Sequence, residues 1–191
     1  MDHSFKKRRF DFTFDARQTL IGAQSAKLGG FRIGLEYRRV HRVGFGVFGL
    51  SEGAFVNQLQ TIHPNITAAY LNLTYSSIYY ERVLYFNRKW EWSATAHLGN
   101  GWIEGRYQLG DNTDWIAIPA IRVKPLEVSS SLYYHLNWWI SVGVGGGYRH
   151  MRQTPAEARE IYNAPIALFK LKVRFFKLIK GAFNPDVRHQ Y

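Results

Sequence analysis

The sequence contains no cysteine and no long apolar run, and each absence excludes a class of structure. Without cysteine there can be no disulfide framework and no thiolate-bound metal. A helix that crosses a bilayer needs about 18 consecutive apolar residues. The uncharged stretch LNWWISVGVGGGY, residues 136–148, is shorter than that and contains Asn137. We therefore expect neither disulfides nor a transmembrane helix.

Acidic residues are scarce as well. The chain of 191 residues has 14 Asp and Glu against 25 Lys and Arg, which gives a formal net charge of +11. Proteins that bind nucleic acid gather such charge on one face or one helix. Here the basic residues are spread from KKRR near the N-terminus to KLKVRFFKLIK near the C-terminus, with no recognition-helix pattern. The sequence therefore predicts no nucleic-acid partner.

Catalytic and metal-binding motifs are also missing. The seven histidines show no metal-ligand spacing, and no serine, histidine and acid group into a catalytic set. The glycines of VGVGGGYR, residues 142–149, alternate within an extended pattern, whereas a phosphate loop places its glycines between a strand and a helix. We interpret them as close packing inside a sheet. No metal, no cofactor and no enzymatic activity are expected.

What the sequence does have is alternation. In GGFRIGLEYRRVHRVGFGVFGL, residues 29–50, apolar residues alternate with charged residues and glycine. Side chains of a strand point to opposite faces with a period of two, so this segment is a hairpin with one apolar face. The pattern predicts eight strands, one helical piece, one domain and a C-terminal tail. The strands are expected at 9–21, at two positions within 27–50, and at 66–86, 89–106, 116–134, 138–149 and 165–176, the helical piece at 155–162, the domain at 1–178 and the tail at 179–191.

The expected connections alternate between short and long. Outer-membrane barrels have this asymmetry, with an even number of antiparallel strands, short periplasmic turns and longer extracellular loops. The sequence therefore predicts an all-β fold: a single closed, antiparallel, up-and-down transmembrane β-barrel of this orientation. The short links are 39–42, 86–88 and 135–137, and the long ones are 22–29, 51–65, 107–115 and 150–164.

The number of aromatic side chains indicates which strand face points inward. An eight-stranded barrel has an interior just wide enough for side chains to fill, and the apolar faces carry rings such as Phe10, Phe31 and Trp90 that would overfill it. With these faces turned to lipid, the lumen holds charges of both signs, which can form ion pairs. A soluble lipocalin-like barrel that binds an apolar ligand is the alternative. The predicted lumen network comprises Asp11, Asp15, Arg32, Glu36, Arg38, Glu91, Glu127, Lys170, Lys172 and Arg174.

Three segments carry a family resemblance: residues 29–50, YYERVLYFNRKWEW at 79–92, and ISVGVGGGYRH at 140–150. With them the chain resembles the small outer-membrane β-barrel proteins of Gram-negative bacteria, of the OmpA-transmembrane or OmpX type, and barrels common in Bacteroidota. The resemblance implies a location in the bacterial outer membrane and export with a signal peptide. MDHSFKKRRFDF has no apolar core behind its basic residues, so we expect that the signal peptide was removed or that the start is truncated.

The expected function combines the lumen with the resemblance. A lumen filled with charged side chains should not conduct solutes, so we expect a non-enzymatic surface, structural or complex-associated component of the outer membrane. The resemblance leaves a lipid A-modifying outer-membrane enzyme as an alternative. The expected partners are outer-membrane lipid and lipopolysaccharide, and other outer-membrane or periplasmic proteins are further candidates.

Several basic residues fall in or beside the long connections, on the side assigned to the cell exterior. Arginine binds phosphate through two parallel hydrogen bonds, and the outer leaflet carries the phosphates of lipopolysaccharide. By strand face, Arg149 also belongs to the lumen. The predicted lipopolysaccharide contacts are Lys27, Arg106, Arg149, Arg152 and Arg159.

Overall fold

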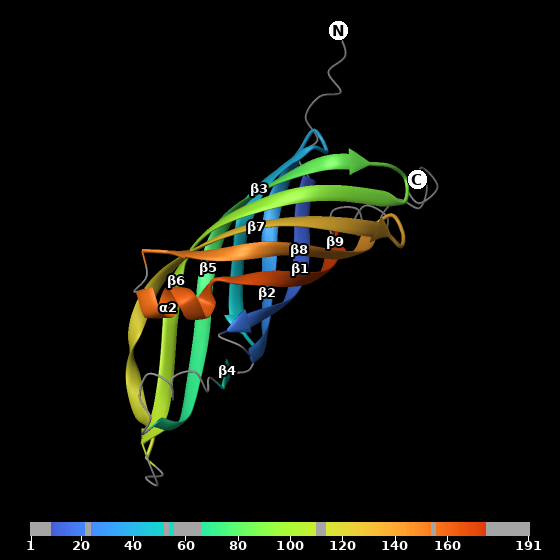
Figure 1. The fold of residues 1–191 in the computed structure, drawn as a ribbon. Helices are drawn as coiled ribbons and strands as arrows, with labels where there is room; N and C mark the ends of the chain where they lie inside the picture. Colours follow the sequence, from blue (N-terminus) through green and yellow to red (C-terminus); the bar gives the residue numbers. More distant parts are fainter. Residues whose placement is uncertain are drawn as a thin grey trace.

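Antiparallel strands curl into a closed barrel in the computed structural model of the chain (Figure 1), which describes residues 9–21, 24–51, 54–55, 66–109, 114–153 and 156–174. Neighbouring strands pair along the chain, and the sheet closes because β1 pairs with β9 and β3 with β5. The strands are β1 (Arg9–Ile21), β2 (Gln24–Tyr37), β3 (His41–Leu50), β4 (Ala54–Phe55), β5 (Ile66–Phe86), β6 (Trp90–Leu109), β7 (Ile116–His135), β8 (Ile140–Arg152) and β9 (Ala164–Val173), and the helix is α2 (Ala156–Tyr162).

The eight predicted strands are confirmed, with one addition. The short strand β4 pairs with Leu71 and Tyr70 of β5, beyond the residues that β3 occupies. Two residues carry no periodic signal, so the sequence could not predict this strand. The predicted helical piece is observed as α2. The predicted tail at 179–191 lies outside the described residues, as do residues 175–178.

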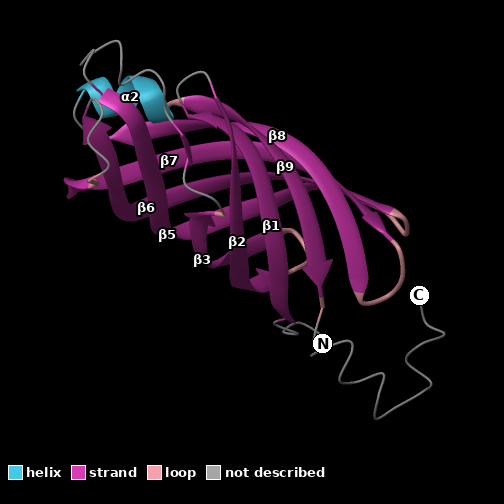
Figure 2. Ribbon diagram, turned by 90° about the horizontal axis from the view of Figure 1, so that it is seen from below, coloured by secondary structure: helices cyan, strands magenta, loops and turns pink. Residues whose placement is uncertain are grey.

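The tight turns owe their geometry to a few residues. The side-chain oxygen of Asn87 accepts hydrogen bonds from the backbone N–H groups of Lys89 at 2.8 Å and Trp90 at 2.6 Å. Asn137 caps Trp139 and Ile140 in the same way, at 3.0 Å each. Asn is favoured in turns because its short side chain can bond to nearby backbone. These turns lie at one end of the barrel, which we call the turn end, and α2 lies at the other, the loop end (Figures 1 and 2).

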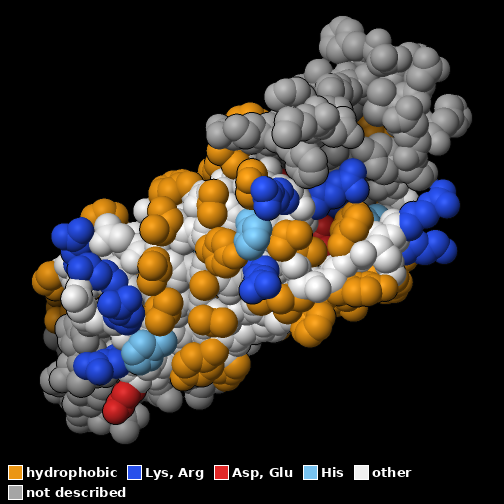
Figure 3. Space-filling view, turned by 90° about the horizontal axis from the view of Figure 1, so that it is seen from above, with side chains coloured by type: hydrophobic (Ala, Val, Ile, Leu, Met, Phe, Trp, Pro, Cys, Tyr) orange, Lys and Arg blue, Asp and Glu red, His pale blue; other side chains and the backbone are white. Residues whose placement is uncertain are grey.

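The outer wall is apolar along the part of the barrel that adjoins the turn end. Figure 3 shows hydrophobic side chains dispersed over the visible face, with groups of Lys and Arg near both ends and in its central part. Exposure of so much apolar surface marks an interaction with lipid or protein. The exposed large side chains of this band include Phe10, Phe14, Phe31, Ile33, Phe45, Ile78, Trp92, Leu98, Val128, Leu132, Val144 and Phe169.

Toward the loop end the inside of the wall becomes apolar, and polar side chains appear on the outside. On β5 the side chains of Leu71 and Leu73 point inward and are buried, whereas Asn72 and Thr74 point outward and are exposed. Glu104 lies opposite Asn72 on β6 and is also exposed. The inside of the barrel is therefore apolar at this end, whereas the outside combines polar side chains with exposed apolar ones such as Leu20, Trp102 and Ile116. The inner cluster consists of Ile21, Ala26, Leu28, Phe48, Leu71, Leu73, Tyr75, Ile103, Val123, Met151 and Tyr162.

No helix within the described residues combines the length and the apolar character that a membrane crossing requires.

Candidate functional site

The interior next to the turn end is lined by charged side chains that are buried and balanced in sign. They come from all eight long strands, and alternation alone directs them inward. Since burying a charge is costly unless it is paired, this composition requires ion pairs. The buried carboxylates are Asp11, Asp15, Glu36, Glu81, Glu91 and Glu127, and the buried cations are Arg17, Arg32, Arg42, Arg149, Lys170 and Lys172.

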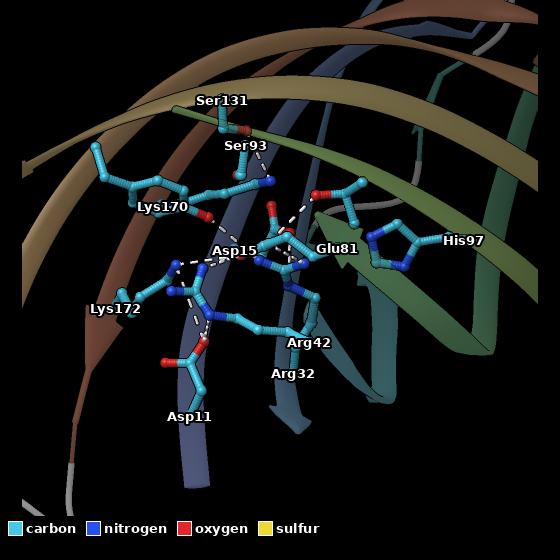
Figure 4. Close-up of polar contacts among 12 residues, drawn as sticks. Asp11, Asp15, Arg32, Arg42, Glu81, Ser93, His97, Ser131, Lys170 and Lys172 are labelled. Atoms are coloured by element: carbon cyan, nitrogen blue, oxygen red, sulfur yellow. Dashed lines mark hydrogen bonds and ion pairs between the residues drawn. The ribbon is translucent and has the colours of Figure 1, made fainter. Parts of the chain in front are cut away.

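Arg42 of β3 is the centre of the ion-pair cluster nearest the turn end (Figure 4). Its guanidinium binds both oxygens of Glu91, at 2.7 and 2.8 Å, and one oxygen of Glu36 at 2.8 Å. A third carboxylate, Glu81, lies 2.5 Å from Nη1. The ammonium of Lys172 approaches Glu91 at 2.8 Å and Glu81 at 3.3 Å. Bidentate arginine–carboxylate pairs are among the strongest hydrogen-bonded contacts in proteins, so this cluster ties together β2, β3, β5, β6 and β9.

A second cluster lies closer to the apolar layer. Arg17 pairs with Asp15 at 3.1 Å and also binds Glu127. The hydroxyl of Tyr75 accepts a hydrogen bond from Arg17 at 2.8 Å and donates one to Glu127 at 2.6 Å. Arg149 completes the group, because its Nε donates to Glu127 at 2.8 Å.

Arg32 connects the two clusters. It lies 3.6 Å from Asp15 and 3.3 Å from Glu81. Its guanidinium also lies over the ring of Tyr79, 4.7 Å from the ring centre. The ion pairs therefore form one continuous network rather than isolated bridges, and charge removal at any point is expected to affect neighbouring pairs.

Most members of the predicted lumen network lie in the lumen. Arg174 is half-buried and lies 3.5 Å from Glu91. The prediction that Arg38 lies in the lumen is wrong. Arg38 is exposed in the β2–β3 turn, because β2 ends at Tyr37 and strand alternation no longer directs the next side chain inward. The eight predicted residues that are buried inside are Asp11, Asp15, Arg32, Glu36, Glu91, Glu127, Lys170 and Lys172.

The sequence interpretation missed three members of the network: Arg17, Arg42 and Glu81. Arg17 continues the inward face of Asp11 and Asp15, so alternation contained the signal. Glu81 follows Tyr79 on one face of β5. That face could not be recognised as the inner one from the sequence because most of it is apolar.

The rim prediction requires one correction as well. Arg149 is 0% exposed and paired with Glu127, so it belongs to the lumen and not to the outer rim. The reason is strand parity, since Arg149 shares the inward face of β8 with Gly143 and Met151. The four other predicted rim residues, Lys27, Arg106, Arg152 and Arg159, are exposed, and the exposed Arg122 and Lys124 lie on β7 near them.

Glycines of the wall give space to inward aromatic rings. A Cβ added at Gly143 would lie 2.5 Å from the ring of Tyr133, so only glycine admits that ring. The Lys172 ammonium in turn lies 3.8 Å from the centre of the Tyr133 ring. The glycine-rich run on β8 is therefore part of the lumen wall, as its alternation predicted.

His97 is buried in the lumen and contacts a hydroxyl rather than a carboxylate. Its Nδ1 lies 3.1 Å from the Ser77 hydroxyl, and its ring packs against Phe48 and Tyr79. Such a pair lacks the third group that orients the base in a Ser-His-acid set. Within the described residues, no three His, Cys, Asp or Glu side chains come together as metal ligands.

The chain is similar to solved structures of membrane barrels. No protein-family model and no curated protein sequence matches the chain. The N-terminal β-barrel domain of Pseudomonas aeruginosa OprF is similar with a TM-score of 0.56 at 7% identity, over 87% of this chain and 98% of that one. Neisserial surface protein A (NspA) is similar with a TM-score of 0.54 at 12% identity, over 88% of this chain and 97% of that one. The chain therefore has the closed antiparallel barrel fold of small outer-membrane β-barrel proteins.

Proposed function

We propose that the chain is a non-enzymatic integral protein of the bacterial outer membrane that acts as a surface, structural or complex-associated component. One observation carries the proposal: the wall that adjoins the turn end is apolar outside and charged inside, whereas toward the loop end the inside becomes apolar and the outside mixes polar and apolar side chains. A soluble barrel has no reason to carry an apolar outer wall around a charged interior. A membrane provides such a reason, because lipid stabilises apolar side chains that face outward within the thickness of the bilayer. The same inversion disfavours a lipocalin-like cavity.

We also propose that the lumen does not conduct solutes. Two barriers lie in series along the axis. The first is the ion-pair network around Arg42 and Arg17, and the second is the apolar cluster that contains Leu28, Phe48 and Leu73. An ion crossing the second barrier would have to leave water without a compensating partner, which is costly.

The expected result is a protein found in the outer-membrane fraction, with heat-modifiable mobility on gels and without channel activity. Heat-modifiable mobility reports a closed barrel that resists detergent until it is boiled. Planar lipid bilayers measure conductance directly, and the network should leave it at the baseline of protein-free bilayers. Stable conductance steps that depend on the protein would contradict the closed lumen, and a soluble fraction would contradict the membrane location.

Lipopolysaccharide is the partner that we propose for the outer face of the loop end. The exposed basic residues there lie beyond the apolar band that adjoins the turn end, and we expect lipid phosphates at that level. Arg106 lies over the ring of Trp115, 5.3 Å from its centre, and the Nε of Arg122 donates to Asn100 at 3.0 Å. Each contact holds the guanidinium of its arginine against the outer wall of the barrel. The proposed contact residues are Lys27, Arg106, Arg122, Lys124, Arg152 and Arg159.

Replacing both Arg106 and Arg122 with glutamine is expected to reduce the lipopolysaccharide that copurifies with the protein. It should also lower thermal stability in bilayers that contain lipopolysaccharide, but not in bilayers without it. Glu160→Gln, which removes an exposed charge on α2 that belongs to neither basic group, is the control and should lower neither quantity. Equal lipopolysaccharide retention by the double variant and the wild type would exclude these arginines as the contact.

A further inference from the structure

The exposed charges at the turn end are all positive within the described residues. The carboxylates near this end, Asp11, Glu36, Glu81 and Glu91, are buried. The six buried carboxylates and six buried cations of the lumen cancel, so the formal net charge of +11 is carried outside that set. We call the exposed basic group at this end the turn collar, and it consists of Arg38, Arg39, Arg82, Arg88 and Lys89.

The β2–β3 turn places arginine where the backbone does not favour it. Arg38 and Arg39 have φ angles of 54° and 59°, and the N–H of Val40 donates to the carbonyl of Tyr37 at 3.2 Å. Residues 37–40 thus form a β-turn with positive φ at both central positions, inside a three-residue connection between the paired residues Tyr37 and His41. Asn and Gly are the residues that adopt positive φ most readily in such turns. Arginine is strained in that region, and such strain persists mainly where the side chain has a function. The pair is therefore not explained by the fold.

The turn and β5 bring the collar charges together. The N–H of Val83 donates to the carbonyl of Val40 at 2.7 Å, which holds β5 against the turn. Arg82 lies opposite His41, the first residue after the turn. The arginines at 38, 39 and 82 thus concentrate positive charge on a short stretch of the rim, with no acidic side chain exposed beside them in the part of the chain that the structure describes.

Exposed aromatic rings accompany the collar. The Arg38 guanidinium lies over the ring of Tyr37, 5.2 Å from its centre, and Tyr85, Phe86 and Trp90 are exposed at the same end. Aromatic rings are enriched at the headgroup level of membranes, and basic residues near a membrane surface attract anionic lipids. The apolar band continues directly from these rings, so a lipid fits this rim better than a soluble acidic partner does.

We propose that the turn collar binds the headgroups of anionic phospholipids in the leaflet at the turn end. The inference rests on the proposed membrane location and adds a second lipid contact at the end opposite to the lipopolysaccharide face. Arg38 and Arg39 are the central contacts, and Arg82 and Lys89 widen the site along the rim.

The double variant Arg38→Asn, Arg39→Gly separates lipid binding from folding, because it installs the pair that the turn geometry prefers. In phosphatidylcholine bilayers its unfolding midpoint in urea should equal or exceed that of the wild type. Addition of phosphatidylglycerol should raise the midpoint of the wild type, and the variant should lose more than half of that increase. The wild-type increase should also shrink at high salt, since exposed charges are screened. Arg82→Gln with Lys89→Gln leaves the turn unchanged and should lose part of the same increase.

Each opposing outcome is distinct. An undiminished response of the Asn-Gly variant to phosphatidylglycerol would overturn the collar proposal and leave the membrane location intact. Protection of the wild type by soluble polyglutamate, without a response to phosphatidylglycerol, would also overturn it, because the partner would then be an acidic chain. Failure of the wild type to insert into either bilayer would instead contradict the membrane proposal itself. Glu104→Gln with Glu160→Gln removes two exposed charges at the loop end that belong to neither basic group; this double variant is the control and should keep the full response.

Discussion

Arg42→Met is expected to lower the free energy of unfolding by about 3–5 kcal/mol, the range for breaking a buried ion pair by removing one partner. The substitution leaves Glu36, Glu81 and Glu91 buried without their shared guanidinium, and Lys172 alone cannot reach all three: it contacts Glu81 and Glu91. Methionine fills a comparable volume, so the loss measures charge more than packing.

Urea unfolding of the protein in lipid bilayers measures the effect. Adding Glu91→Gln to Arg42→Met should recover part of the lost stability, because it removes one of the uncompensated charges. In phosphatidylcholine bilayers, which lack anionic headgroups, Arg82→Met replaces an exposed arginine and should change the midpoint little. An unfolding midpoint of Arg42→Met equal to that of the wild type would show that the ion-pair network does not hold the lumen together.

The second large effect is expected on the outside of the barrel. Val144→Arg puts a charge on a side chain that is 59% exposed, between Leu132 and Phe169 on the neighbouring strands. If lipid covers this surface, the arginine should cost about 2–4 kcal/mol near the bilayer centre. In a water-exposed wall the same change would cost almost nothing, since surface substitutions are usually well tolerated.

Asn72→Arg is the matched control for that substitution. Asn72 is exposed and also points outward, but it lies nearer the loop end, where polar side chains such as Thr74 and Glu104 are exposed beside it. Arginine there should leave the unfolding midpoint unchanged or raise it slightly through the cross-strand pair. Equal effects of Val144→Arg and Asn72→Arg would contradict a lipid-covered band that ends between the two levels.

Alternation predicted the strands and their faces, but not which face is inner at every level. The rule that apolar faces point to lipid holds where Phe31 and Val144 are exposed, and fails on β5, where Leu71 and Leu73 are buried. Alternation shows which residues of a strand share a face. Whether lipid or water lies outside that face depends on the height of the residue along the barrel axis. Height follows from strand register and tilt, which a single sequence does not reveal. The prediction that Arg149 lies at the rim is wrong for a related reason. It relies on the nearness of Arg149 to a loop, whereas the position of Arg149 on its strand directs the side chain inward.

The partners inside the lumen could not be predicted at all. Arg42 and Glu91 are 49 residues apart in the chain and meet only because the barrel closes around them. Opposite charges on inward faces showed that pairs must form, because unpaired charges would be too costly. The choice among the possible pairs depends on side-chain reach across the lumen and on glycines such as Gly143 that make room.

Site-directed spin labelling in lipid bilayers tests the inverted barrel most directly. The chain has no cysteine, so single cysteines can be introduced without background labelling. Nitroxides at positions 45 and 144, in place of Phe45 and Val144, are predicted to collide more with oxygen, which concentrates in lipid, than with a water-soluble nickel complex. A nitroxide in place of Asn72 should show the opposite preference. If the labels at 45 and 144 meet the nickel complex as readily as the label at 72, the apolar wall faces water and the membrane account is wrong.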